Sequence, residues 1–542
     1  MTRDVHNVMK THKIKESEMT NIPIPFHVHY QLQEFLLLPS FFISLILAMF
    51  VIKWVFFTNP SNNNLPPSPS KLPIIGNLHQ LGMTPHRSLT SLARLHGPIM
   101  LLQLGRERTF VISSPNFARE IMKTHDIIFA NRPYSSIARK LLYDYRDLSW
   151  SPYGEYWRQM RSICVMRLLS TRRVQSFRSL REEETIQMIE KVALRSCSGS
   201  SPIDLSEILI SLTNNVICRA AFGMTCGEGE AGGKLKKLLE ELGELLGMFC
   251  VGDFIPWLAF LDKLTGLDAR VERVFKHLDS FLNYVIDHHM TRQRQDVATN
   301  GGVIVKEDQK DFLDVLLEIQ NDGTNGISMA RENMKAIILD MFAGGTDTTY
   351  TALEWALTEL IKHSKTMKKV QEEVRRIAGS KSYINEDHIE KMFYLKAVIK
   401  ETLRLHPPVP LLLPRQATKD VQVGGYNIPA KSRVIINAWA IGRDPASWEE
   451  PEKFKPERFL DNCSSFKGND FHFIPFGAGR RGCPGATFAI AIVELVLSNL
   501  LYKFDWALPD EQREEDLDVD ESNGITIHRK FPLVVVATPH RF

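Results

Sequence analysis

The sequence predicts one large, mainly α-helical domain with a small β part, placed behind an N-terminal transmembrane helix. Three observations lead to this fold class. Residues 35–52 form an uncharged apolar run. Behind this run, eight segments repeat apolar residues at i, i+3 and i+4, which is the period of a helix with one buried face. From about residue 60 onward there is no second linker, repeat or low-complexity tract, although 542 residues alone would suggest several domains.

Composition narrows the class of protein. Apolar residues make up 44% of the chain and charged residues 24%, which is the balance of an ordinary globular protein and excludes collagen-like and disordered chains. Lys and Arg together number 66 and Asp and Glu 63, so the formal net charge is only +3. So small an excess argues against a protein that coats a polyanion.

The apolar run has the length of a membrane span. Its 18 residues would form a helix of roughly 27 Å, close to the thickness of the hydrocarbon core. With the aromatic residues that follow it, the anchor is predicted at 35–57. A cleaved signal peptide is the alternative, but no small-x-small cleavage site follows the run and 34 residues precede it. Basic residues such as Lys53 and Lys71 follow the run, which favours a cytosolic body and a luminal extension at 1–34.

The anchor is followed by a proline-rich segment at 58–75, where Leu65-Pro66-Pro67-Ser68-Pro69 is expected to be extended and stiff. It is either a rigid strut or a plain spacer, and the remaining domain would span 76–542. The sequon at 462–464 would face the cytosol and stay unglycosylated. Whether the chain starts at Met1 or Met19 is left open.

The helical periodicity is clearest in long segments of the body. Helices are predicted at 176–196, 204–222, 234–248, 269–293, 331–363, 366–378, 390–405 and 486–501. Short alternating segments predict strands of a minor sheet at 99–104, 108–112, 421–428 and 432–437.

A glycine-dense loop surrounds Cys483. The segment 475–485 reads PFGAGRRGCPG and precedes a predicted helix. Glycines let the backbone approach a flat, bulky group, and the positive end of a helix dipole favours a thiolate. A thiolate placed in this way can ligate iron. For a lone cysteine, the alternative is a buried core residue in a turn.

The wider pattern F-x-x-G-x-R-x-C-x-G favours the iron ligand. Its fixed positions would match by chance in about one in ten thousand sequences of this composition. With this pattern the chain resembles the cytochrome P-450 superfamily, in particular the plant microsomal A-type members (the 71 clan), over nearly all of the body. The resemblance implies the cytochrome P-450 fold and haem b (iron protoporphyrin IX) with Cys483 as its axial iron ligand. The other loop residues that it assigns to the haem are Phe476, Arg481 and Gly485.

The predicted helix at 331–363 contains an unusual centre, Gly344-Gly345-Thr346-Asp347-Thr348-Thr349. Interior glycines cost about 1 kcal/mol each relative to alanine, so close approach of another group is expected there. Thr348 can bond back to a carbonyl one turn earlier, which locally opens the helix. The resemblance assigns proton delivery during oxygen activation to Asp347 and Thr348. A packing glycine pair with a capping threonine is the alternative for this motif alone.

Two further sets of residues follow from the resemblance. Glu401 and Arg404 share a helix face at i, i+3, and the family joins them to a later arginine, here Arg458, in a buried structural ion network. The alternative is a set of solvated surface pairs. Four residues match the partners of the haem propionates: Trp157, Arg161, Arg415 and Arg481. His406 would tempt a metal assignment, but the thiolate already accounts for the iron.

The substrate contacts are predicted from family segments. Ala343, Val409, Leu411 and Ile525 are expected to face the pocket, and 131–150 to form a variable wall. All four residues are apolar, which favours a lipophilic small molecule, although core packing would account for each of them equally well.

No flavin or dinucleotide motif occurs, so electrons must come from another protein. The resemblance implies an NADPH–cytochrome reductase, and Arg158, Arg167 and Arg480 are expected to help form its docking face. The predicted activity is insertion of one atom of O2 into a lipophilic plant metabolite such as a terpenoid, alkaloid or phenolic, at the cytosolic face of the endoplasmic reticulum membrane. A haem-thiolate isomerase or dehydratase, and a non-catalytic membrane haem protein, are the alternatives. Substrate, position of attack, number of oxidation steps and oligomeric state are left open.

Overall fold

The chain divides into two compact units, residues 1–63 and 64–542. The computed structural model describes residues 40–51, 64–196, 202–225, 230–300, 310–322, 329–460, 465–466, 468–509 and 512–541. In the first unit, Ser40–Val51 is an apolar helix with exposed side chains, inside the predicted membrane span. The extension at 1–34, the remainder of the span and the sequon at 462–464 lie outside the described residues.

Long helices build most of the second unit, as predicted. The eight that match the periodic segments are α7 (Arg178–Ser196), α8 (Leu205–Phe222), α9 (Glu230–Gly247), α12 (Leu267–Asn300), α14 (Arg331–Lys362), α15 (Ser364–Ala378), α17 (Phe393–Leu405) and α19 (Ala486–Lys503). Shorter helices that the sequence analysis did not predict are α2 (Pro85–His96), α3 (Pro115–Arg119), α4 (Ser136–Leu141), α5 (Glu155–Ile163), α6 (Thr171–Ser176), α10 (Val251–Phe254), α11 (Phe260–Leu264), α13 (Phe312–Asp322), α16 (Glu386–Ile389) and α18 (Ala438–Ile441).

The β part is small and forms three sheets among the described residues. The largest has the order β1 (Ile99–Leu104), β2 (Glu107–Ile112), β7 (Arg433–Ile436), β4 (Arg415–Gln416), with β2 parallel to β7 and the other pairs antiparallel. A hairpin joins β5 (Val421–Val423) to β6 (Tyr426–Ile428). The third sheet has the order β3 (Ile203–Asp204), β9 (Val534–Pro539), β8 (Phe504–Ala507), and sequence patterning had not indicated it.

Local sequence sets several helix ends. The side chain of Asp204 accepts the backbone N–H of Glu207 and so caps the first turn of α8. At the other end of this helix, Gly223 adopts the left-handed conformation at φ 63° that commonly ends a helix. Helix α7 runs beside α8, and the large buried core joins both to α14 and α19.

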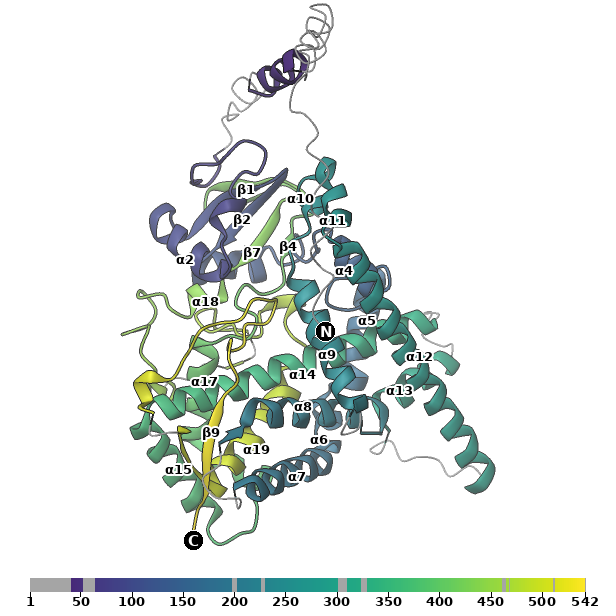
Figure 1. The fold of residues 1–542 in the computed structure, drawn as a ribbon, viewed down its shortest axis with the longest axis vertical. Coiled ribbons are helices and arrows are strands. Elements are labelled where there is room, and N and C mark those ends of the chain that lie inside the picture. Colours follow the sequence, from purple (N-terminus) through teal and green to yellow (C-terminus); the bar gives the residue numbers. More distant parts are fainter. Residues whose placement is uncertain are drawn as a thin grey trace, which may run out of the picture. The chain divides into compact units, whose positions relative to one another are not determined.

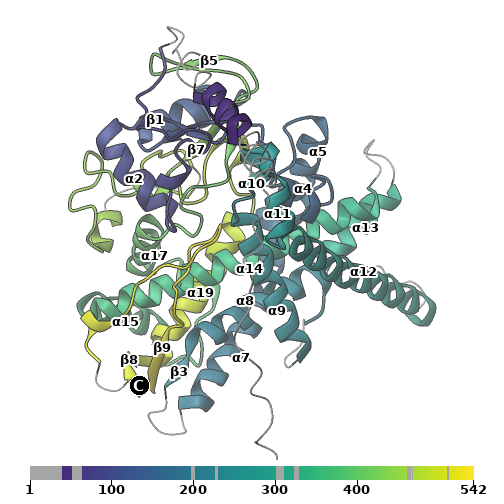
Figure 2. The same cartoon turned by 45° about the horizontal axis from the view of Figure 1, so that its top comes forward.

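Helix α14 crosses the centre of the second unit, and α8 and α19 pack against it (Figures 1 and 2). The four-stranded sheet lies apart from this bundle, beyond the segment that follows α17 (Figure 1). One membrane-length apolar helix without a bend occurs in the described parts of the chain, α19, and it is mostly buried as a core helix. One interior cavity is lined by the middle of α14, by the start of α19 and by the segment after α17 that leads into the four-stranded sheet.

The described part of the proline-rich segment, residues 64–75, differs from the expected linker. Residues 64–75 lie in the second unit and contact the sheet region: the Leu101 N–H donates to the Pro67 carbonyl at 2.9 Å, and Asn64 donates to Gly425. Leu65 packs against the core beneath the sheet. The compact unit therefore begins at 64 and not at 76, because extended prolines leave carbonyls that a neighbouring strand can use.

Candidate active site

A cavity opens in the interior beside the middle of α14. Its walls come from the middle of α14, from α9, from the 142–150 region, from the segment after α17 and from the cysteine loop. Several predicted residues line it: Trp157, Arg161, Ala343, Asp347, Thr348, Val409, Arg415, Phe476, Arg481, Cys483, Gly485 and Ile525. Residues that lie far apart in the chain, and that were selected from separate motifs, therefore share one space.

Backbone geometry explains why two positions of the cysteine loop are glycine. Gly479 has a φ of +69°, and a Cβ built there would lie 2.2 Å from the Met122 carbonyl oxygen, so no other residue fits. Gly477 has a φ of +67°. The loop closes on itself through a hydrogen bond from the Cys483 N–H to the Phe476 carbonyl at 2.9 Å. This turn brings Cys483 to the cavity immediately before α19.

The Cys483 sulfur faces the cavity, and its electrostatic environment is mixed. Burial raises the pKa of the thiol, while the backbone N–H groups of Gly485 and Ala486 and the charge of Arg161 lower it. The two N–H groups belong to the start of α19, where unpaired donors favour a negative charge. The loop therefore offers hydrogen-bond donors to a thiolate whose residue is exposed in the structure, as expected of a sulfur that binds a metal cation.

Helix α14 runs without a break through its glycine pair, and the two glycines have different surroundings. A Cβ on Gly345 would lie 2.6 Å from the Ile217 side chain, so this glycine lets α8 pack closely. A Cβ on Gly344 would meet no atom within 4 Å, so this position is open. The Thr348 hydroxyl donates to the Gly344 carbonyl at 2.6 Å, as the sequence suggested. The carboxylate of Asp347 points toward α9, with Oδ2 3.9 Å from the Cβ position of Gly243.

Four arginines line the cavity, and burial lowers the pKa of all of them. Burial is the largest cause for Arg161, for Arg415 (to about 10) and for Arg481 (to about 9). Burial and the charges of Arg481 and Arg415 also lower the pKa of Arg132. Burial and the repulsion between neighbouring arginines both disfavour the charged forms of these side chains. A bound anion would therefore stabilise the cluster.

One nitrogen of the Arg415 guanidinium lacks a hydrogen-bond acceptor among the described residues. Arg415 Nη2 donates to the Ala478 carbonyl at 2.9 Å, but buried Nη1 has no hydrogen-bond partner in the described parts of the chain and lies 3.6 Å from Asp126 Oδ1. An orphaned buried guanidinium nitrogen is costly, so it marks a place for an acceptor from a bound group. A thiolate at one end and a cluster of arginines at the margin fit haem, which offers an iron and two carboxylates.

Comparison with known proteins agrees with this fit. The family profile described as Cytochrome P450 matches residues 66–534. The chain belongs to the cytochrome P450 family. It is 54% identical to "Cytochrome P450 736A117" of Prunus mume over 89% of this chain and 92% of that protein. It is 54% identical to "Cytochrome P450 71A1" of Persea americana over 86% and 91%, and 50% identical to "Norfluorocurarine oxidase" of a Strychnos species over 93% and 98%.

Solved structures agree on the fold. A zebrafish cytochrome P450 with abiraterone superposes with a TM-score of 0.70 at 24% identity, covering 85% of this chain and all of that one. The family prediction and the mainly helical fold are thereby confirmed. This chain is a P450 monooxygenase, and the cofactor of its family is haem held through a thiolate.

In this P450, the indole of Trp157 uses its donor within the protein. Its Nε1 donates to the Leu148 carbonyl at 3.0 Å, and the guanidinium of Arg481 lies 4.3 Å from its ring centroid. The same arginine donates to the carbonyls of Ala130, Leu148 and Ser151. The pair thus lines the cavity as a stacked unit whose N–H groups also bind the loop 147–151.

The Glu–Arg network joins α17 to the segment 442–458, and Glu401 and Arg404 in it are fully buried, whereas Arg458 is partly buried. Glu401 accepts Nε and Nη2 of Arg404 at 2.7 and 2.8 Å, and Nε of Arg458 at 3.0 Å. Arg404 also donates to the carbonyls of Gly442, Pro451 and Lys453. The structure brings the three predicted residues together, and this arrangement fastens the segment 442–458 to α17.

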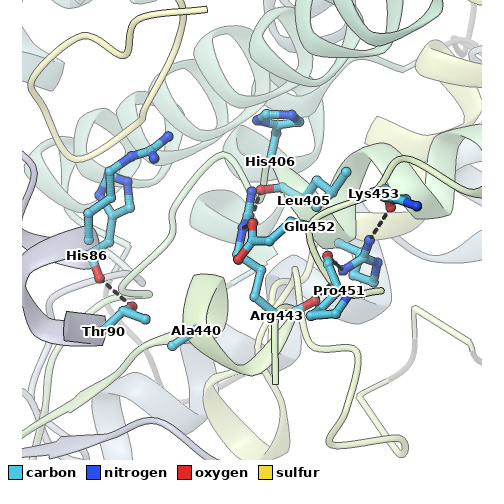
Figure 3. A network of polar contacts seen from close by, with 12 residues as sticks. His86, Thr90, Leu405, His406, Ala440, Arg443, Pro451, Glu452 and Lys453 are labelled. Carbon is cyan, nitrogen blue, oxygen red and sulfur yellow. Dashed lines mark hydrogen bonds and ion pairs between the residues drawn. The ribbon is translucent and has the colours of Figure 1, made fainter. Parts of the chain in front are cut away.

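A neighbouring arginine extends this network. Arg443 donates to the Leu405 carbonyl at 2.6 Å and to Glu452 at 3.0 Å (Figure 3). His406 lies beside it and is no metal ligand here: its Nε2 is 2.7 Å from Glu359 Oε1, and its ring stacks on Trp355 at 4.1 Å. Burial lowers the pKa of His406, while Glu359 opposes the decrease.

The predicted substrate contacts separate into two groups. Ala343, Val409 and Ile525 line the cavity, but Leu411 does not. Leu411 packs against the core cluster beneath β1 and β2, whereas Leu412, with a φ of 49°, and Leu413 line the cavity. The prediction for Leu411 was therefore wrong, because the left-handed turn at its neighbour reverses which side chains face inward.

Three functional candidates were missed from the sequence. Arg132 adds a fourth cavity cation and donates to the carbonyls of Ser149, Leu413 and Pro414. Asp126 joins Arg415 to Arg480, whose Nη1 it accepts at 2.9 Å. Asp340 lies on the cavity side of α14. Two of them had a signal: Arg132 lies within the predicted wall at 131–150, and Asp340 lies seven residues before Asp347 on the same helix. Asp126 belongs to no motif or segment that the sequence analysis used.

Proposed function

We propose that this P450 inserts one atom of O2 into a lipophilic plant metabolite, with electrons from NADPH by way of a reductase. One observation carries the proposal: the open face of α14 at Gly344 and Thr348 lines the same cavity as the Cys483 sulfur. A small reactant can therefore lie between a proton-handling helix and the iron ligand. The alternatives without oxygen have no use for such a helix.

Each residue would have a distinct part in this chemistry. Cys483 would hold the haem iron through its thiolate, and Arg161, Arg415 and Arg481 would hold the two haem carboxylates. When bound, haem supplies O2 activation, which thiolate donation favours. The Thr348 hydroxyl keeps one proton on Oγ1, donated to the Gly344 carbonyl in this state, and can redirect it into the cavity. Asp347 would resupply that proton from the α9 side, where Gly243 leaves room beside the carboxylate.

The substrate class follows from the walls. Apolar side chains dominate the cavity beyond the arginine cluster, including Leu142, Leu239, Leu246, Leu412 and Ile525. Apolar walls with a few polar groups favour a lipophilic small molecule. One relative is named as the oxidase of norfluorocurarine, so alkaloids belong in the panel of test compounds beside terpenoids and phenolics.

Membrane and partner would be those of a microsomal enzyme. The span at 35–52 would anchor the chain in the endoplasmic reticulum with the body in the cytosol. Of the expected docking residues, Arg158 is exposed and stacks near Tyr153, whereas Arg167 and Arg480 each have a carboxylate within 4 Å. We expect charge reversal at Arg158 to raise the KM for the reductase more than reversal at Arg167 does.

The function is tested by expressing the full chain in microsomes with an NADPH–cytochrome reductase and supplying a lipophilic panel under 18O2. The expected result is a product that contains one labelled oxygen and requires both NADPH and reductase. Cys483→Ser is the control and should abolish the strongly red-shifted band of the reduced carbon monoxide complex. Product formation without O2 or reductase would refute the proposal, as would wild-type turnover by Cys483→Ser.

A further inference from the structure

A buried carboxylate on α14 has contacts that the proposed chemistry does not use. Asp340 precedes Asp347 by two turns and also lines the cavity. Its Oδ2 accepts the backbone N–H groups of Leu148 and Ser149, and its Oδ1 lies 2.8 Å from the Ser149 hydroxyl. These contacts join the central helix to a loop, residues 147–151, that lies almost 200 positions earlier in the chain.

The other side of this loop holds the cofactor-side cations. The Leu148 carbonyl accepts Trp157 Nε1 at 3.0 Å and Arg481 Nη1 at 3.1 Å. The Ser151 carbonyl accepts Arg481 Nη2 at 2.6 Å, and the Ser149 carbonyl accepts Arg132 Nε at 2.8 Å. Since the peptide N–H groups at 148 and 149 bind Asp340, the carbonyls of the same loop point away from α14 and toward these side chains.

The chain enters the loop under strain. Tyr143, Asp144 and Tyr145 are three consecutive non-glycine residues at positive φ, with values of 53°, 57° and 63°. Such conformations cost roughly 1 kcal/mol or more each and persist only where contacts over-determine them. The Tyr143 hydroxyl donates to Asp279 at 2.9 Å, which secures the start of the turn. After this turn, the backbone N–H groups of Leu148 and Ser149 are bound by the carboxyl group of Asp340.

A second carboxylate shares the same hydroxyl. The Ser149 oxygen lies 2.6 Å from Asp147 Oδ2 and 2.8 Å from Asp340 Oδ1, but it carries a single hydrogen. One of the two contacts must therefore be donated by a protonated carboxyl group. Burial and the neighbouring Asp147 raise the pKa of Asp340 to about 8, which agrees with a retained proton. Asp147 and Asp340 together therefore carry less negative charge than two ionised carboxylates. They bind the loop without neutralising the positive charge of the arginine cluster.

We propose that Asp340 is a positioning residue that holds the loop 147–151, and that the loop carbonyls in turn orient Trp157, Arg481 and Arg132 toward the haem carboxylates. This inference rests on the proposed haem site. It assigns to Asp340 an effect on cofactor retention that is separate from proton delivery by Asp347 and Thr348.

The test compares Asp340→Ala with Glu354→Ala in the full-length holoprotein. Glu354 is a matched control: it is a buried acid on the same helix, but it contacts Ser206 and Tyr350 and not the loop. Haem loss is followed by transfer of haem to an excess of apomyoglobin, which requires no turnover. Losing the acceptor of two backbone N–H groups should accelerate haem loss about tenfold in Asp340→Ala. Glu354→Ala should change the rate less than threefold.

Hydrogen exchange supplies the second readout, since a merely destabilised protein would also lose haem. Amide protection of peptides covering 142–151 should fall in Asp340→Ala, with unchanged protection of α8 and α19. Ser149→Ala removes only the shared hydroxyl and should give a smaller acceleration of haem loss in the same direction. Equal haem loss and equal loop protection in wild type and Asp340→Ala would overturn the inference. A wild-type protein that binds no haem would instead overturn the proposed function.

Discussion

Replacing Glu401 by Gln tests the buried ion network that joins α17 to the segment 442–458. Glu401 and Arg404 are both completely buried, and the carboxylate accepts three guanidinium N–H groups and the backbone N–H of Lys455. The amide keeps one acceptor oxygen, turns an NH2 group toward the guanidinium groups and leaves the charge of Arg404 uncompensated. Breaking a buried pair in this way costs about 3–5 kcal/mol.

The size of the expected thermal shift follows from the size of the compact unit. Unfolding entropy is about 2.1 cal/mol/K per residue, so about 480 residues give roughly 1 kcal/mol/K and a decrease of about 3–5 °C in Tm. The assay is far-UV circular dichroism of the holoprotein in detergent, paired with the reduced carbon monoxide spectrum. Because the network fastens 442–458 to α17, the fraction of chains with the thiolate-type spectrum should fall as well.

Glu373→Gln is the matched control for this variant. Glu373 accepts the backbone N–H groups of Tyr394 and Leu395 at the start of the same helix, and the amide oxygen can retain one of these bonds. We expect a loss of about 1 kcal/mol, and hence a shift of about 1 °C. A Glu401→Gln protein with the Tm and spectrum of Glu373→Gln would refute the argument that this network is a structural fastening.

Three further predictions concern the helix, the loop and the C-terminal segment. Thr348→Val removes the hydroxyl proton and should lower product formed per NADPH severalfold with an unchanged carbon monoxide spectrum; an unchanged ratio would remove Thr348 from proton handling. Gly479→Ala, whose Cβ meets a carbonyl at 2.2 Å, should yield little haem protein, whereas Gly425→Ala, equally left-handed but with no atom within 4 Å, should yield near-normal amounts in the same spectral assay. Burial raises the pKa of Glu521, but hydrogen bonds from His86 and the adjacent arginine lower it to about 2, from an ordinary value of 4.5. A lowered carboxyl pKa stabilises the fold above pH 4.5 by about 2 kcal/mol after solvent screening, and this stability disappears as the pH falls toward 2. Glu521→Gln should therefore lower Tm by about 2 °C at pH 7 and by much less at pH 3, and a decrease of equal size at both would contradict the assignment.

Local patterns were sufficient for the helices and for the cysteine loop. The spacing of apolar residues located the eight long helices, because one buried face imposes its period on the sequence. The ends agree to within four residues, except that α12 continues seven residues beyond its predicted end. The offsets around Cys483 marked the loop, because each position has its own requirement, such as the left-handed φ at Gly479. Glu401 and Arg404 could be paired from spacing, since i, i+3 residues on a helix are neighbours whatever the rest of the fold does.

Contacts between distant segments needed the tertiary structure. Leu411 was expected in the pocket, but Leu412 has a left-handed backbone conformation, and its side chain lines the cavity in place of that of Leu411. The proline-rich residues from 64 onward joined the sheet region, because strand β1 offered an N–H to the Pro67 carbonyl. Neither outcome leaves a mark in the local sequence.

By itself, then, the sequence determined the family and the helices and located the glycine-dense loop around Cys483 and the Asp347–Thr348 pair of α14, because these depend on residues within one or two turns of each other. Only the tertiary structure decided which charges meet across the cavity. Arg132, Asp126 and Asp340 come from different parts of the chain and gain their roles from backbone carbonyls and N–H groups that folding brings to them. Every residue has these backbone groups, so a sequence motif does not show which of them will bind a given side chain.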